Sequence, residues 1–142
     1  PSMMRRQGAQ QAMEDAGIVF NDKLYGLSNY DFESAYHAMN GLLARRAEFT
    51  ALFAMSDVIA FGAIRALVSA GLRVPEDVSV IGFDGITMSR YCVPVMTTIV
   101  QPSEQIALQS IELLVRQIEH GTPAQTVTLQ PELQQGESVR AI

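Results

Sequence analysis

The chain has 142 residues, of which 48% are hydrophobic, and its 10 basic and 15 acidic residues give a net charge of −5. This composition is typical of one folded domain, and the negative charge argues against a nucleic-acid surface built from clustered lysine and arginine. One cysteine, Cys92, excludes an intrachain disulfide and a multi-cysteine metal site. Since no apolar run reaches the ~18 residues of a membrane span, we expect a cytoplasmic domain without a membrane partner.

The first predicted element is a helix over residues 2–17. Small and apolar residues recur there every four positions, and Gly17 follows as a left-handed helix end: Met4, Gly8, Ala12, Ala16. Because this helix has no strand before it, we expect the chain to be the latter part of a longer protein. Two basic pairs, Arg5–Arg6 and Arg45–Arg46, lie in helical patterns and are interpreted as solvated helix faces.

Two more helices are predicted over residues 33–46 and 57–71, with Ser56 or Asp57 as the cap of the second. Between the helices lie short apolar runs over residues 50–55, 78–83 and 97–100. Continuous apolar strands that alternate with helices indicate an α/β fold, an open parallel sheet with helices on both faces. A fourth helix is predicted over 103–121, and residues 126–142 are expected to form one or two late strands with a turn near Gly136.

Polar side chains follow each of the predicted strands. Ser56 and Asp57 come after the first strand, Asp84 after the second and Gln101 after the third. In an open parallel sheet the ligand crevice lies outside the carboxyl ends of the strands. We therefore expect these side chains to meet at a binding site.

Three segments carry a resemblance to a known family: "FAMSDVIAFGAIRALVSAGLRVPEDVSVIGFDG", "SRYCVPVMTTIVQP" and "YDFESAYHAM". The chain resembles the effector-binding domain of the lactose/galactose-repressor family of bacterial transcription regulators, and the third segment is most similar to its purine-repressor members. The resemblance implies a periplasmic-binding-protein-like fold that is incomplete here. Residues 1–100 would form mostly the C-terminal subdomain, 101–125 a crossover strand and helix of the N-terminal subdomain, and 126–142 the return. The DNA-binding headpiece would lie outside this chain.

The resemblance also implies site residues. Arg5 would reach a small effector, a sugar or a purine-like base, with Phe32 lining the cleft against its ring. Ser56 lies where the family often has Asn or Asp, and Asp84 matches a carboxylate that accepts hydrogen bonds from the effector. No cofactor, metal or catalytic residue is implied.

A homodimer is implied as well, through the third helix and the segment "SRYCVPV". Its apolar cluster would form the interface: Tyr91, Cys92, Val93, Val95. The sequence also departs from the family. The segment "DFESAY" is two residues shorter than in the purine-repressor members, and Gly136 and Glu137 stand where arginine is common.

Several of these residues have plainer interpretations. Asp57 begins a helix and is more often a cap than a ligand, so we place it behind the site, and Phe32 could equally be a core aromatic. A hydrolase would need a nucleophile elbow that the sequence lacks, His37 lies within a helix, and Lys23 is misplaced for a receiver domain. A secreted sugar-binding protein of a transport system, which shares the fold, is the serious alternative.

Overall fold

A computed structural model describes residues 2–46 and 48–141. Within these residues the chain forms four α-helices, two short 3-10 helices and four strands. In chain order they are α1 (Ser2–Asp15), η1 (Asp22–Leu24), α2 (Phe32–Ala44), β1 (Ala51–Phe53), α3 (Asp57–Ser69), β2 (Ser79–Asp84), η2 (Thr87–Arg90), β3 (Thr97–Val100), α4 (Ser103–His120) and β4 (Glu132–Gln134).

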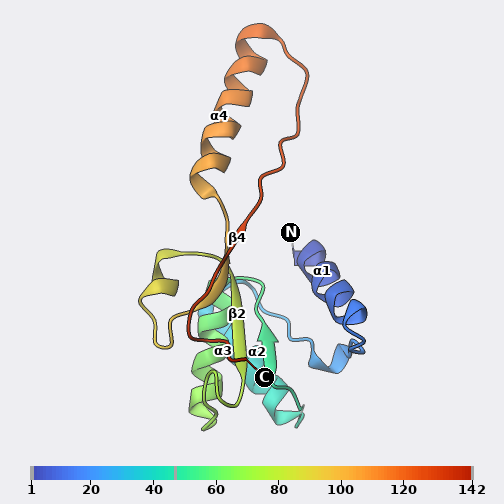
Figure 1. The fold of residues 1–142 in the computed structure, drawn as a ribbon, viewed down its shortest axis with the longest axis vertical. Helices are drawn as coiled ribbons and strands as arrows, with labels where there is room; N and C mark the ends of the chain where they lie inside the picture. Colours follow the sequence, from blue (N-terminus) through green and yellow to red (C-terminus); the bar gives the residue numbers. More distant parts are fainter. Residues whose placement is uncertain (1, 47, 142) are drawn as a thin grey trace.

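The strands form one open sheet in the order β1-β2-β3-β4 (Figure 1). The first three strands are parallel, with Leu52 opposite Val80 and Gly82 opposite Thr98. Strand β4 pairs with β3 in the antiparallel direction. The predicted α/β open sheet is therefore confirmed, and its late strand makes the sheet mixed.

Helices α2 and α3 cover one face of the sheet. The residues that lie between this helix pair and the strands are almost fully buried, among them Leu67, Val80 and Met96. Gly62 brings the two helices close, because a Cβ at that position would lie 2.4 Å from the carbonyl oxygen of Phe32. The core of the chain is this helix–sheet layer.

The opposite face of the sheet is only partly covered. Since side chains alternate along a strand, Val80 and Gly82 face α3, whereas Ile81 and Phe83 face away from it. Helix α1 reaches this second face through Arg5, whose guanidinium lies over the Phe83 ring. The small-residue face predicted for α1 is exposed along its length, as at Met4, which is 76% exposed.

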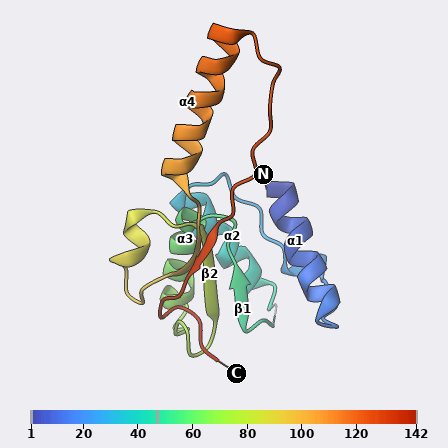
Figure 2. The ribbon, with the colours of Figure 1, turned by 45° about the horizontal axis from the view of Figure 1, so that its top comes forward.

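Helix α4 projects away from the sheet, and the following segment runs back beside it toward β4 (Figures 1 and 2). Three apolar residues on α4 are exposed, at 61% for Ile111, 52% for Leu114 and 73% for Ile118. Because the resemblance assigns this helix to the other subdomain, we expect its apolar side to lack cover in the isolated chain. Its exposure confirms that prediction.

Candidate functional site

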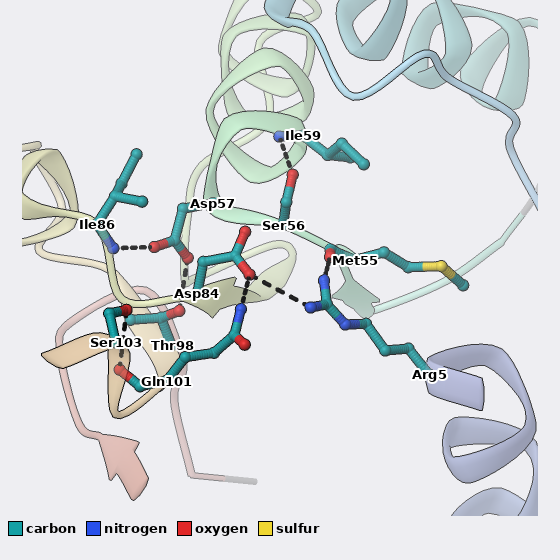
Figure 3. Close-up of polar contacts among 10 residues, drawn as sticks. All are labelled: Arg5, Met55, Ser56, Asp57, Ile59, Asp84, Ile86, Thr98, Gln101 and Ser103. Atoms are coloured by element: carbon teal, nitrogen blue, oxygen red, sulfur yellow. Dashed lines mark hydrogen bonds and ion pairs between the residues drawn. The ribbon is translucent and has the colours of Figure 1, made fainter. Parts of the chain in front are cut away.

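The site lies at the carboxyl edge of the parallel strands. Strand β2 ends at Asp84, Met55 and Ser56 follow β1, and Gln101 follows β3. Figure 3 shows that the side chains of Asp84 and Gln101 meet there with Arg5, which comes from α1. The structure therefore brings together three of the residues that the sequence singled out, and they come from three separate elements.

The backbone holds Asp84 in an unusual conformation. Its φ is +115°, a value that costs a non-glycine residue about 1–3 kcal/mol. Gly85 follows with a φ of +72°, and a Cβ there would lie 2.7 Å from Val100 Cγ2. The Gln101 N–H donates to the Asp84 carbonyl oxygen at 3.1 Å. This hydrogen bond ties the turn to the residue that follows β3. The turn in this way holds the Asp84 carboxylate at the carboxyl edge of the sheet.

One oxygen of Asp84 carries its contacts with the chain. Gln101 Nε2 donates to Oδ1 at 2.6 Å, and Arg5 Nη2 lies 3.4 Å from the same oxygen. Among residues 2–46 and 48–141, no hydrogen bond to Oδ2 is found. Since a carboxylate oxygen has two acceptor sites, Oδ2 is available to a hydroxyl or a ring N–H.

Arg5 is pre-oriented by neighbours that the sequence did not identify. Its Nη1 donates to the Met55 carbonyl oxygen, and its Cζ lies 3.7 Å from the centre of the Phe83 ring. Only 17% of its side chain is exposed. The interpretation of Arg5 as part of a solvated helix face was therefore wrong, whereas Arg45 and Arg46 are exposed as expected. Phe83 was missed because it appeared to be an ordinary apolar strand residue.

The structure shows which of Ser56 and Asp57 caps α3. The buried Ser56 hydroxyl accepts the Ile59 N–H at 3.2 Å and caps α3. Ser56 was one of the two predicted caps, and the effector contact that the resemblance implies for it stays a prediction. Asp57 does not cap α3, because its carboxylate bonds to Thr98 and Ile86 instead.

Phe32 is an exposed aromatic residue and not part of the core. It is the first residue of α2, its side chain is 54% exposed, and its ring stacks on Phe61 with 6.1 Å between the ring centres. Because α2 leads into β1, its first turn lies on the same edge of the sheet as the carboxyl ends of the strands. The interpretation of Phe32 as a core aromatic was wrong for this chain, and its contact with an effector stays a prediction.

The predicted interface cluster lies beyond η2. Val93 is 93% exposed and Tyr91 78%, while Cys92 and Val95 are half-buried. The Cys92 sulfur lies within hydrogen-bond distance of the carbonyl oxygens of Ser89 and Pro94, and burial raises the pKa of this thiol.

A separate cavity of about 300 Å³ lies between α1, η1, α2 and β1. Its lining is mainly apolar and includes Met13, Phe20, Met39 and Leu52. Asp84 and Gln101 do not line it, so this cavity is distinct from the polar site.

The described part of the chain offers no cluster of three or more His, Cys, Asp or Glu residues that could hold a metal ion. Across residues 2–46 and 48–141 no helix is long and apolar enough to span a membrane.

Three parallel strands with a polar cluster at their carboxyl ends define a binding-protein-like α/β domain. The sequence matches the family described as "Periplasmic binding protein-like domain" over residues 1–139, and the chain belongs to this family. Its relatives there are regulators of the lactose/galactose-repressor (LacI) family, as the resemblance implied.

Among curated proteins, the chain is 39% identical over 137 residues to the HTH-type transcriptional regulator MalR of Clostridium butyricum, covering 96% of this chain and 41% of MalR. It is 37% identical over 142 residues to the HTH-type transcriptional repressor PurR of Histophilus somni, covering 99% of this chain and 43% of PurR. A solved complex of the regulator CelR with cellobiose superposes with a TM-score of 0.90 at 35% identity, covering 94% of this chain and 41% of CelR. The chain thus spans about two fifths of the length of these relatives.

Proposed function

We propose that this chain is the ligand-sensing and dimerisation part of a bacterial transcriptional regulator. In this proposal a small effector, a sugar or a nucleobase, binds at Asp84 and controls operator binding by a headpiece outside the chain. The observation that carries the proposal is the constellation of Asp84, Gln101 and Arg5, in which Asp84 Oδ2 remains available as an acceptor. The functional class, a transcriptional regulator, is inferred from the similarity to CelR, MalR and PurR.

The chemistry of the site suits a ligand with several hydroxyl or N–H groups. Asp84 would accept from the ligand, while Arg5 and Gln101 would donate from side chains whose directions are already fixed. The exposed Phe32–Phe61 stack would cover an apolar sugar or base face. Solved structures of similar regulators contain cellobiose, lactose and ribose. Saccharides are therefore the first ligands to test.

The effector would act by closing two subdomains on each other. Residues 1–100 and 126–142 would belong mostly to one subdomain and residues 101–125 to the other. The exposed apolar side of α4 supports this division, because a second subdomain would bury Ile111, Leu114 and Ile118. A ligand that touches both subdomains favours the closed state by its difference in affinity for the two states. Closure would then change the spacing of paired headpieces in a homodimer.

A transport protein with the same fold is disfavoured, because the relatives named above are regulators. This similarity supports the proposal of a cytoplasmic location. The test is calorimetry of the full-length protein with ribose, lactose, cellobiose and hypoxanthine, followed by operator binding with and without the probe that binds. We expect one class of probe to bind and to change operator affinity. Failure of all four to bind, or binding that leaves operator affinity unchanged, would contradict the proposal.

A further inference from the structure

Asp57 forms a buried clamp between three elements. It is the first residue of α3 and is fully buried. Its Oδ1 accepts the Thr98 hydroxyl at 2.5 Å, and its Oδ2 accepts the Ile86 N–H at 2.8 Å (Figure 3). One carboxylate therefore ties the start of α3 both to β3 and to the segment after β2.

Gly82 makes room for this clamp. It lies opposite Thr98 in the sheet, and a Cβ on Gly82 would lie 2.3 Å from Asp57 Oδ1. The Asp57 carboxylate thus passes directly over the β2 backbone on its way to β3. The positive end of the α3 dipole and the two donors together stabilise its charge.

The clamp holds the turn that carries Asp84. Ile86 lies two residues beyond Asp84, and the intervening backbone has φ values of +115° at Asp84 and +72° at Gly85. The turn is held on one side by the Gln101 N–H, which donates to the Asp84 carbonyl oxygen, and on the other by Asp57 through the Ile86 N–H. A strained backbone persists only where its surroundings determine it in this way.

We propose that Asp57 is a positioning residue, which fixes the direction of the Asp84 carboxylate toward an effector without touching the effector itself. This inference rests on the proposed function, in which Asp84 is the effector contact. Removal of the clamp would let the turn at residues 84–86 relax and would misdirect Asp84.

The geometry defines a conservative variant that keeps the clamp. In Asp57→Asn the amide oxygen can accept the Ile86 N–H, and the amide nitrogen can donate to the Thr98 hydroxyl, which turns round to accept. Asp57→Ala removes both bonds. In the double variant Asp57→Asn/Thr98→Val the buried amide nitrogen has no acceptor, and we expect the amide group to turn toward another acceptor and release the Ile86 N–H, so the rescue fails. Thr98→Val alone leaves the Ile86 bond in place and is the matched control.

The first measurement is amide hydrogen exchange of the full-length protein without ligand. We expect the Ile86 and Gln101 amides to exchange about tenfold or more faster in Asp57→Ala and in the double variant, and near the parent rate in Asp57→Asn, because exchange reports local opening. The amides of Ser79 and Val80, which donate to the carbonyl oxygens of Thr50 and Ser138, should keep their rates. Equal acceleration across the sheet, or no acceleration at Ile86, would overturn the proposal. If Asp57→Ala does not fold, the double variant, compared with Thr98→Val, gives the same answer.

The second measurement is calorimetry with whichever of ribose, lactose, cellobiose and hypoxanthine binds the parent. We expect Asp57→Ala to bind about tenfold more weakly and Asp57→Asn to bind nearly as the parent does, as is usual for residues that orient a ligand-contacting side chain. Parent-like affinity in Asp57→Ala would overturn the positioning role. If no probe binds the parent, the proposed function fails, whereas the clamp is still judged by exchange.

Discussion

Arg73 and Asp77 form an ion pair across the turn that leads into β2. Arg73 Nε and Nη2 donate to the two carboxylate oxygens of Asp77 at 2.9 and 2.8 Å, and the Arg73 N–H also donates at 2.8 Å. The side-chain hydrogen bonds from Arg73, followed by the one from its backbone, lower the pKa of Asp77 far below its ordinary value of 3.8. Three donors thus favour the charged carboxylate in the folded state.

The sign of the resulting pH dependence follows from this lowered pKa. A carboxyl whose pKa is lower in the folded state stabilises the fold above its unfolded pKa, and the contribution is lost as the pH falls below about 4. We expect Asp77→Asn to lower the melting temperature at pH 6 and to lower it less at pH 3. Melting curves at both pH values check this, with Glu76→Gln, an exposed neighbour, as the control. An equal loss at both pH values would contradict it.

The roles of Ser56, Asp57 and Arg5 could not be predicted from the sequence. Serine and aspartate are both favoured helix caps, so the sequence could not choose between Ser56 and Asp57. Ser56 caps α3 because its side chain points toward the Ile59 N–H in the folded chain. Arg5 looked like a surface residue because its contacts with Met55 and Asp84 are 50 and 79 positions away in sequence. Periodicity carries no information on contacts of that kind.

Helices α2 and α3 depend on Gly62 for their close approach. A Cβ at Gly62 would lie 2.4 Å from the Phe32 carbonyl oxygen and 2.7 Å from Ala35 Cβ. Gly41, in α2, provides a matched comparison, since a Cβ there meets nothing within 4 Å.

We expect Gly62→Ala to destabilise the protein by about 1–3 kcal/mol, because the helices must separate to accept the methyl group. Gly41→Ala should instead stabilise it by about 0.5–1 kcal/mol through helix propensity. Urea unfolding of both variants measures the two free energies. Gly62→Ala as stable as the parent would show that the helix pair is less tightly packed than described.

At the scale of elements, continuous apolar runs in the sequence predicted where the parallel strands lie. The strand predicted over residues 97–100 has the observed bounds, and the others differ by a few residues. The antiparallel direction of β4 was not predicted, because pairing direction depends on the route of the chain after α4. Gly136 lies so close to the segment before β3 that a Cβ would be 2.5 Å from the Val95 carbonyl oxygen. A local pattern cannot reveal that approach.

At the scale of the whole molecule, the segment after η2 offers an apolar surface. Val93 and Tyr91 are largely exposed there, and we propose that they lie in a two-fold dimer interface. Because a two-fold interface is formed by the same surface patch of both protomers, a charge at Val93 is introduced twice.

We therefore expect Val93→Glu to convert the full-length protein from dimer to monomer in sedimentation or solution scattering. Gln7→Glu, which adds a charge on the exposed side of α1, should leave the dimer intact. A Val93→Glu protein that stays dimeric would place the interface elsewhere.

The fold class was predictable at this scale, because apolar strands that alternate with helices allow few architectures. The apolar side of α4 was also predictable, since its exposure follows from an incomplete domain. The exact contacts of the site were not, because they depend on how α1 lies against the second face of the sheet.

The proposed function depends on a contact between Asp84 and the effector. Calorimetry of the full-length protein tests it most directly, with the probe among ribose, lactose, cellobiose and hypoxanthine that binds the parent. Asp84→Asn keeps the shape of the side chain but removes its charge, and we expect the binding free energy to weaken by about 1.5–3 kcal/mol, roughly a 10- to 150-fold loss of affinity. Glu76→Gln, at the opposite end of β2, should bind as the parent does. If Asp84→Asn binds as tightly as the parent, Asp84 only ends its strand and the account is wrong.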